Sequence, residues 1–164
     1  MRLLLGALLV LASCTPGGTP ATPSPTVSSL PSDACHVAAV TFCVLNPDVT
    51  QATISTTICV SGWTATIRPP SNYTSQLKQQ QIAAEHLSDT NPADYEEDHR
   101  VALELGGAPR DPMNLSPEPH SSSFVKDADE NAFKRAVCAG SQTLQQAQAA
   151  FVSKWLAAYP GYLR

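Results

Sequence analysis

One stretch of the chain, residues 94–131, holds most of the side chains whose types and spacing could do chemistry. Asp98 and His99 stand next to each other among further acids. The pair Gly106-Gly107 follows, and Asn114 comes after a loop rich in Pro and Asp. A carboxylate beside an imidazole can hold the ring in one tautomer and make it a better base. The Gly-Gly pair permits the tight reversal that would return Asn114 to the side of His99.

Together these groups suit one divalent cation and a water molecule that is to be deprotonated. Adjacent side chains of a regular strand point to opposite faces, so Asp98 and His99 meet at one centre only if the strand bends or bulges. The alternative interpretation is a structural His that only forms hydrogen bonds, with Glu96 and Glu97 as solvated charges.

The segment before this stretch is rich in β-branched residues and predicts short strands. The expected strands are residues 37–44, 49–54, 56–60 and 63–67. The double proline at 69–70 ends the last of them, because consecutive prolines cannot donate to a ladder. These strands predict a small antiparallel sheet.

Three helices are predicted around and after the central stretch. The first runs from its N-cap Thr74 to about His86, and the second from about Ser123 to Ala139. The third begins at its N-cap Thr143, with Gln146 in a capping-box position, and continues to about Tyr159. Strands followed by helices predict an α+β domain.

The composition sets limits on the class of protein. The chain has 164 residues, of which 43% are hydrophobic, and its mean hydropathy is -0.10, so we expect a folded domain with a real core. The formal net charge of -4 argues against a broad electrostatic grip on nucleic acid. Any phosphate contact would come from a local patch or from a metal ion.

The N-terminus is predicted to be a targeting segment. Residues 1–13 combine a positive start with a short apolar run, and Leu-Ala-Ser before Cys14 resembles the bacterial lipobox. This predicts cleavage before Cys14, a lipid on that residue and an anchor on the outer face of the cell membrane; the alternative is an ordinary secretory signal. Residues 14–33 are rich in Pro, Thr and Ser and are expected to be a disordered tether, which leaves 34–164 as the globular domain.

Four cysteines belong to the predicted domain, and an exported domain with four cysteines is expected to form two disulfides. Three pairings are possible, and we favour Cys35 with Cys43 and Cys59 with Cys138. A zinc cluster is the alternative, but the chain has no Cys-x-x-Cys spacing.

A family resemblance rests on residues 98–107, Asp-His-Arg-Val-Ala-Leu-Glu-Leu-Gly-Gly, followed by Asn114-Leu115. This run resembles the HNH, or ββα-metal, nuclease motif, in which an Asp or His binds the metal, the next His is the general base and the Asn closes the finger. The resemblance extends to a group of actinobacterial exported or lipoprotein HNH-like proteins and covers most of the chain from Cys43 to Trp155. The chain departs from the motif at Ala102, where the family usually has Pro.

The resemblance implies a ββα-metal finger, which with the small antiparallel sheet and two C-terminal helices makes up the expected fold. It implies Asp98 as a metal ligand, His99 as the general base and Asn114 as the amide that orients this base. In the family a third ligand comes from the following helix, but no His occupies the expected position here. The candidates for that ligand are Asp127 and Glu130 first, then His120 and Glu118.

The implied activity is hydrolysis of phosphodiester bonds in nucleic acid, with DNA favoured over RNA as the substrate and with Mg2+ as the cofactor, Mn2+ or Zn2+ being the alternatives. Arg100, Arg110 and Lys126 are candidates for phosphate contact, or otherwise solvated charges. Two other functions stay open at this point. One is a non-catalytic envelope lipoprotein that keeps the finger as a scaffold or binding module, and the other is a hydrolase of another envelope phosphodiester. The sequence indicates no obligate protein partner.

Overall fold

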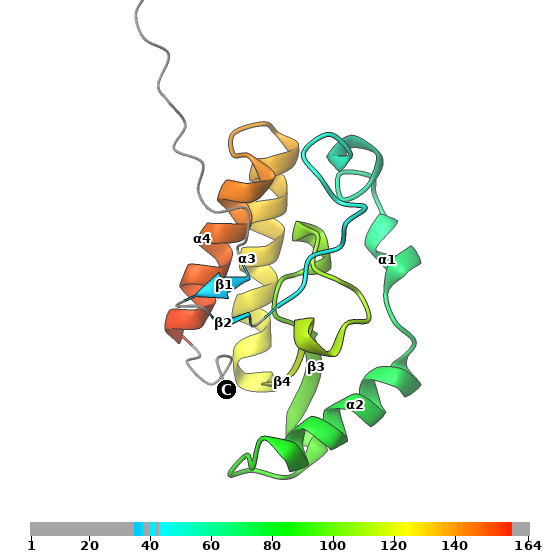
Figure 1. The fold of residues 1–164 in the computed structure, drawn as a ribbon, viewed down its shortest axis with the longest axis vertical. Coiled ribbons are helices and arrows are strands. Elements are labelled where there is room, and N and C mark those ends of the chain that lie inside the picture. The colour runs from blue at the N-terminus through cyan, green and yellow to red at the C-terminus, as the bar shows by residue number, and fades with distance from the viewer. Residues whose placement is uncertain (1–34, 38–39, 42, 159–164) are drawn as a thin grey trace, which may run out of the picture.

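A computed structural model describes residues 35–37, 40, 41 and 43–158, which form a mixed helix and strand fold (Figure 1). The predicted α+β class is confirmed for this part of the chain. Two separate two-stranded antiparallel sheets are present among the described residues, together with four α-helices. The predicted signal segment, Cys14 and the tether lie outside the described residues.

The N-terminal part of the domain contains much less strand than the sequence predicts. Strands β1 (His36–Val37) and β2 (Val40–Thr41) form a short hairpin where the sequence predicts a single strand, 37–44, and β1 begins one residue before that range. Residues 49–60 form turns and a single 3-10 turn, and residues 63–67 form the short helix α1 (Trp63–Ile67). The three predicted strands between 49 and 67 are therefore wrong.

Threonine side chains explain this difference. The Thr53 hydroxyl donates to the carbonyl of Asp48 at 2.7 Å, and the Thr57 hydroxyl donates to the carbonyl of Thr53 at 2.8 Å. Such local bonds from side chain to backbone compete with a sheet ladder. Gly62, whose φ is +77°, then precedes α1 in the left-handed conformation that glycine adopts without steric cost.

The centre of the domain is an antiparallel ribbon of two strands. Strand β3 (Tyr95–His99) pairs with β4 (Leu115–Pro119), and the ladder runs without interruption from Tyr95 opposite Pro119 to His99 opposite Leu115. The loop between the two strands returns the chain through two 3-10 turns. Helix α2 (Ser71–Ala84) contacts both strands, and its Gln81 amide donates to the Leu115 carbonyl at 3.0 Å.

The start of α2 differs slightly from the prediction. The helix begins at Ser71, directly after the double proline, with Pro70 in the N-cap position. Thr74 lies inside the helix, where its hydroxyl donates to the Ser71 carbonyl at 3.1 Å. Proline fixes φ near the helical value and is well suited to a helix start, so the double proline replaces Thr74 as the start signal.

Helices α3 (His120–Cys138) and α4 (Leu144–Ala158) pack against each other and close the core, as Figure 1 shows. Phe133 of α3 meets Phe151 of α4 edge to face, with ring centroids 5.9 Å apart. The predicted capping box is confirmed. The backbone N–H of Gln146 donates to the Thr143 hydroxyl at 3.1 Å, and the backbone N–H of Thr143 donates to Gln146 Oε1 at 3.0 Å. Helix α3 begins three residues before the predicted start, and Tyr159 lies outside the described residues.

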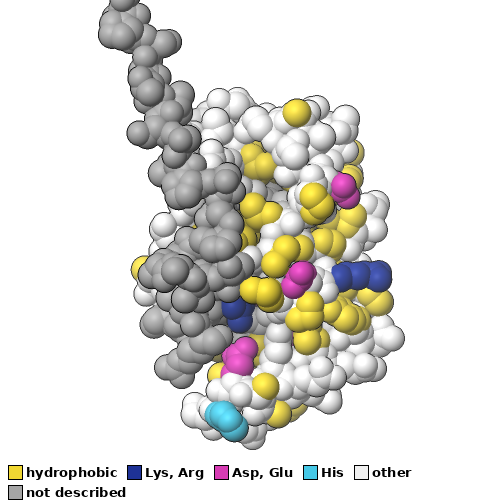
Figure 2. Space-filling model, in the orientation of Figure 1, with side chains coloured by type: hydrophobic (Ala, Val, Ile, Leu, Met, Phe, Trp, Pro, Cys, Tyr) yellow, Lys and Arg dark blue, Asp and Glu magenta, His cyan; other side chains and the backbone are white. Residues whose placement is uncertain are grey.

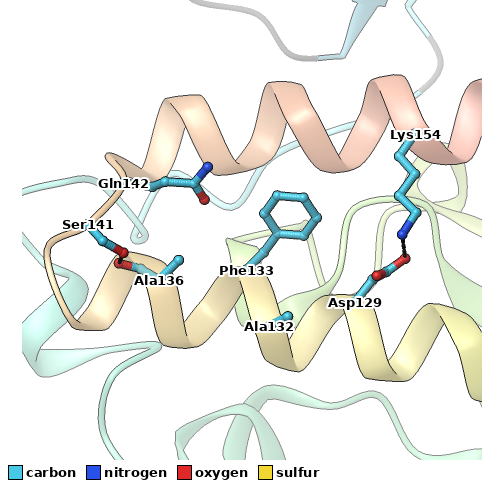
Figure 3. Close-up of a pocket in the computed structure, with 7 residues that line it drawn as sticks. All are labelled: Asp129, Ala132, Phe133, Ala136, Ser141, Gln142 and Lys154. Atoms are coloured by element: carbon cyan, nitrogen blue, oxygen red, sulfur yellow. Dashed lines mark hydrogen bonds and ion pairs between the residues drawn. The ribbon is translucent and has the colours of Figure 1, made fainter.

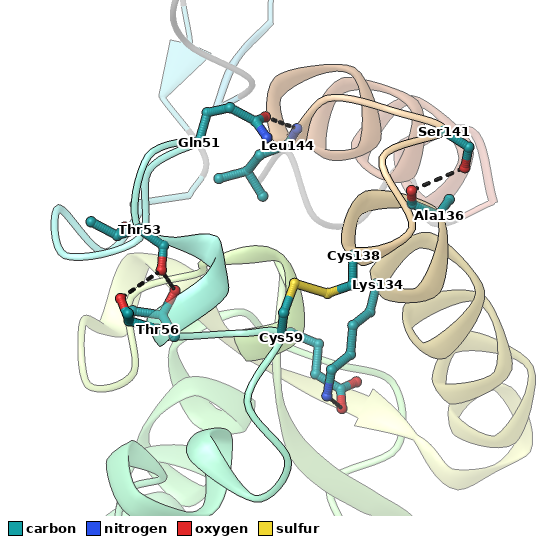
Figure 4. The surroundings of a disulfide bond; sticks show 11 residues. Gln51, Thr53, Thr56, Cys59, Lys134, Ala136, Cys138, Ser141 and Leu144 are labelled. Atoms are coloured by element: carbon teal, nitrogen blue, oxygen red, sulfur yellow. Dashed lines mark hydrogen bonds and ion pairs between the residues drawn. A yellow bond between two sulfur atoms is a disulfide. The ribbon is translucent and has the colours of Figure 1, made fainter.

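Both favoured disulfides are confirmed. Cys35 is bonded to Cys43 across the β1–β2 hairpin, and Cys59 is bonded to Cys138 at the end of α3. Figure 4 shows how the second bond joins the turn-rich segment to α3 near Lys134. The Lys134 ammonium forms an ion pair with Glu104, 3.2 Å apart. The carbonyl of the Gln51 side chain accepts from the N–H of Leu144 at 2.7 Å and fastens the same segment to the start of α4.

The face shown in Figure 2 carries apolar side chains around its middle, with only scattered charged groups among them. Four large apolar side chains of the described residues are exposed: Val60, Met113, Phe124 and Val125. Of the helices described, none has the length and apolar character that crossing a membrane requires.

Candidate functional site

Asn114 closes the loop between β3 and β4 from the inside. Its side-chain carbonyl accepts from the N–H of Val101 at 2.9 Å, and its amide donates to the carbonyls of Val101 at 3.1 Å and Ala108 at 3.0 Å. The side chain is fully buried, so each of these bonds is made away from water. Gly107 leaves room for this arrangement, because a Cβ there would lie 1.8 Å from the Val101 carbonyl oxygen and 2.6 Å from the Asn114 amide nitrogen.

His99 is held by the loop that Asn114 closes. Its side chain is buried, with 3% of the residue exposed, and Nε2 lies 3.1 Å from the carbonyl oxygen of Pro109. A carbonyl only accepts, so Nε2 carries the hydrogen and Nδ1 of the neutral ring is the basic nitrogen. Burial lowers the pKa of His99 below its ordinary value, which keeps the imidazole neutral at pH 7.

Asp98 leaves β3 on the opposite face, toward α3. The ladder is regular through His99, so the bend or bulge that would bring Asp98 and His99 to one centre is not present within the paired strand. The Asp98 carboxylate instead accepts from the Lys126 ammonium of α3. Burial alone would raise the pKa of Asp98, but the charge of Lys126 outweighs it and leaves the pKa below its ordinary value.

Lys126 is the centre of an ion cluster on this face. The side chain is fully buried, and its ammonium donates to Asp98, to the His99 carbonyl oxygen at 2.9 Å and to Glu130 Oε1 at 2.9 Å. Its Nζ also lies 3.6 Å from Glu118 Oε2. An ammonium has three donors, and three strong acceptors use them here. Lys126 was predicted as a phosphate contact, but the structure places it inside the protein among acids.

Three carboxylates converge beside this lysine. One oxygen each from Glu96, Asp98 and Glu118 lie within 4.8 Å of one another. Glu96 and Glu118 are directly opposite in the β3–β4 ladder, and Asp98 is two positions along β3, so all three share one face. Glu118 is fully buried and neither of its oxygens has a hydrogen-bond partner among the described residues.

The cluster has more acids than basic groups. Burial, reinforced by the neighbouring Asp98 carboxylate, raises the pKa of Glu118 to about 8. Burial also raises the pKa of Glu130 to about 7, against the opposing charge of Lys126. Protons therefore take up part of the negative charge that Lys126 leaves uncompensated.

This donor set fits a small divalent cation. Carboxylate oxygens are the ligands that Mg2+ and Mn2+ prefer, and a buried carboxylate without a hydrogen-bond partner is available to supply one. The residues that would hold the cation are Glu96, Asp98 and Glu118. Of these, Asp98 is a predicted ligand and Glu118 is the last of the candidates for the third ligand, whereas Glu96 is not among the predicted ligands and enters the sequence analysis only as a solvated charge of the alternative interpretation.

The two leading candidates for the third ligand lie elsewhere. Asp127 is exposed on α3, and Glu130 is bonded to Lys126 outside the three-carboxylate set. His120 is exposed at the first position of α3. The pairing of Glu96 with Glu118 depends on the register of the two strands, which the sequence reveals only after the loop between them is known.

The predicted phosphate contacts are placed in three different ways. Arg100 is largely buried, with its side chain 10% exposed, and its guanidinium lies 3.9 Å from the Glu85 carboxylate. Lys126 is buried in the cluster, as described above. Arg110 is exposed and directly follows Pro109, the residue that holds His99.

A groove between α3 and α4 lies apart from these residues (Figure 3). Its volume is about 450 Å³, and Phe133 lies in its middle with the ion pair of Lys154 and Asp129, 2.5 Å apart, at one end. Gln142 and Ser141 lie at the other end. None of the predicted catalytic, metal-binding or phosphate-binding residues lines this groove.

Comparisons with models of known protein families, with curated proteins and with solved structures found no significant match. Evidence on function therefore comes from the side chains themselves. The strongest of it is the connection from Asn114 through the loop to His99, together with the carboxylates on the other face of β3.

Proposed function

We propose that this protein is an HNH-type, metal-dependent nuclease that hydrolyses phosphodiester bonds in nucleic acid. One observation supports the proposal above the others. Asn114 fastens the loop at Ala108, and the next carbonyl along the chain, that of Pro109, fixes the tautomer of a buried neutral His99. A strand, a loop closed by Asn, a second strand and a helix follow in the order that the ββα-metal finger requires.

In the proposed reaction His99 is the general base. Its Nδ1 takes a proton from the attacking water, while Nε2 keeps its bond to the Pro109 carbonyl and holds the ring in place. Asn114 is a positioning residue, because it acts on His99 through the loop. The lowered pKa of His99 keeps the base unprotonated at neutral pH.

The carboxylates complete the proposed site. A divalent cation held by Glu96, Asp98 and Glu118 would stabilise negative charge on the phosphate in the transition state. Because Asp98 and His99 leave opposite faces of β3, the substrate phosphate must lie across the end of that strand to meet both. The phosphate must therefore be accessible to the cation from one side and to His99 from the other.

We further propose that the protein acts outside the cytoplasm, anchored by lipid on Cys14. Two disulfides within one small domain favour an oxidising compartment. The processing site itself rests on the sequence alone, since Cys14 lies outside the described residues.

A second candidate function is a non-catalytic envelope lipoprotein that keeps the finger as a scaffold. Lys126 favours it, because a buried ammonium bonded to Asp98 and Glu130 already supplies a cation to the acids. In this case the carboxylates stabilise the fold and need no metal.

A plasmid-nicking assay on the purified chain with Mg2+ or Mn2+ separates the two. His99→Ala should lower the rate about a hundredfold or more, and a chelator should abolish cleavage. His120→Ala is the matched control, because His120 is an exposed histidine at the start of α3 and should leave the rate unchanged. Full activity of the His99→Ala protein would refute the proposed base, and no cleavage with any divalent cation would favour the scaffold.

A further inference from the structure

Two exposed arginines are carried by segments that hydrogen bonds link to the loop holding His99. The first is Arg110. The preceding carbonyl, that of Pro109, lies 3.1 Å from His99 Nε2, and the Arg110 carbonyl accepts from the Tyr73 hydroxyl at 2.6 Å. The backbone of residues 109–110 is therefore held between His99 and the first turn of α2, and the Arg110 side chain that leaves it is exposed.

The second arginine, Arg68, reaches the same region from α1. Its N–H donates to the Thr64 carbonyl at 3.0 Å and ends that helix. The next two residues are prolines, of which Pro69 is buried, and they fix the backbone between Arg68 and the turn of α2 that carries Tyr73. Because the Tyr73 hydroxyl donates to the Arg110 carbonyl at 2.6 Å, the chain that follows Arg68 leads directly to the loop segment that carries Arg110.

Neither guanidinium is used elsewhere in the described part of the molecule. No ion pair or hydrogen bond of the Arg68 or Arg110 side chain is formed with a described residue, and both residues are exposed. Apart from Arg135, which is also exposed, the other described basic side chains are engaged: Lys126, Lys134 and Lys154 with acids, Arg100 near Glu85, and Lys78 with the Tyr95 carbonyl. The nearest acid in sequence to Arg110 is Asp111, whose carboxylate accepts from the N–H of Met113 at 2.9 Å.

We infer that Arg68 and Arg110 bind consecutive phosphate groups of a single-stranded nucleic acid and place one phosphodiester beside His99. The inference rests on the proposed function and adds the substrate class and a binding residue, Arg68, to it. Arginine binds phosphate oxygens through paired N–H donors, and a base at Nδ1 needs a phosphate within reach.

The choice of a single strand follows from the charge of the protein. With a formal net charge of -4, the chain has no broad basic surface to follow the paired backbones of a duplex. Two arginines give about two phosphate contacts, which suits a short flexible strand that bends toward a local site. Each contact on single-stranded nucleic acid contributes about -0.7 to the slope of log binding constant against log salt.

The test measures binding without cleavage. A fluorescent oligo-dT is titrated with the full chain in chelator at several salt concentrations, and anisotropy gives the binding constant. Arg68→Gln and Arg110→Gln should each weaken binding about tenfold at low salt and make the slope shallower by about 0.7. Arg68→Lys should keep the slope, because it keeps the charge. Arg135→Gln is the matched control, an exposed arginine near the end of α3, and should change neither quantity.

The outcomes separate this inference from the proposed function. If binding depends on Arg68 but no cleavage follows in Mg2+, the inferred phosphate site is supported and the proposed nuclease activity is refuted. If the wild-type protein cleaves nucleic acid and Arg68→Gln has the same KM as the wild type, the nuclease proposal is supported and the inferred phosphate site is overturned. Equal binding by Arg68→Gln and Arg135→Gln, or no binding of oligo-dT by the wild type at low salt, would also overturn it.

Discussion

At the level of single residues, Lys126 determines the charge of the site. Burying an ammonium is costly unless its donors are all bonded, and here they reach Asp98, Glu130 and the His99 carbonyl. The same ammonium lies 5.8 Å from the centre of the Phe151 ring, so it joins the ion cluster to the apolar core. Removing it would leave the acids without their basic partner.

Lys126→Met should therefore destabilise the protein by about 3–5 kcal/mol at neutral pH, as measured by urea unfolding. The loss should shrink as the pH falls, because protonation removes the charges of Asp98, Glu118 and Glu130. Lys154→Met is the matched control, since that side chain is 53% exposed in its pair with Asp129, and it should cost less than about 1 kcal/mol.

The same variant tests the carboxylates as a cation site. If Glu96, Asp98 and Glu118 bind Mg2+, millimolar Mg2+ should restore part of the lost stability in Lys126→Met and stabilise the wild type less. Equal unfolding midpoints with and without Mg2+ in the variant would contradict the proposed ligand set.

At the level of elements, the sequence predicted the helices well but did not predict where side-chain hydrogen bonds to the backbone would replace strands. The predicted helices formed with shifted ends, because their apolar spacing and capping residues act within one element. The strands predicted between residues 49 and 67 failed, because the Thr53 and Thr57 hydroxyls bond to nearby carbonyls. β-branched composition alone does not show which of these competing bonds will form.

The site shows the same division. The family resemblance implied that Asn114 closes the loop, and its amide does bond across the loop to Val101 and Ala108, although the expected contact with His99 is not among its described hydrogen bonds. The position of Lys126 could not be predicted, because a lysine on a polar helix face usually reaches solvent. Glu96 was missed for a related reason: its partner Glu118 is distant in the chain, and only the strand register places them opposite each other.

Gly107 is the position in the loop where a side chain is least tolerated. Gly107→Ala should destabilise the protein by about 3 kcal/mol, since a methyl group would overlap the Val101 carbonyl and displace the Asn114 amide. Nicking activity, if present, should fall with it, because the Pro109 carbonyl would move away from His99. Unfolding in urea gives the stability change.

Gly140→Ala is the control for the loss of a glycine as such. Gly140 follows α3 with φ of +73°, and a Cβ there would have open space, so only the backbone cost of about 1 kcal/mol applies. Similar losses for the two variants would show that the loop accommodates a side chain at Gly107.

At the level of the whole molecule, the described fold has few strands and depends on long-range ties. The turn-rich segment before α1 forms almost no sheet, yet Ile58 and Val49 of that segment are buried in the core. The Cys59–Cys138 bond joins this segment to α3 across a sequence separation of 79 residues (Figure 4), and both strands of the β3–β4 ribbon lie between the two cysteines in the sequence. The bond therefore limits the unfolded chain more than any local contact does.

Replacing Cys59 and Cys138 together by Ser should lower the free energy of unfolding by about 4 kcal/mol, since stabilisation grows with the length of the closed loop. The Cys35 and Cys43 double replacement is the control. It opens a loop of only 8 residues and should cost about 2 kcal/mol. Urea unfolding of the two double variants, with and without reductant, measures both losses.

If the two losses were equal, or if reductant left the stability of the wild type unchanged, the long-range bond would not hold the domain together. The expected result makes the fold dependent on an oxidising compartment, because reduction alone would remove a large part of the 5–15 kcal/mol that a domain of this size typically has.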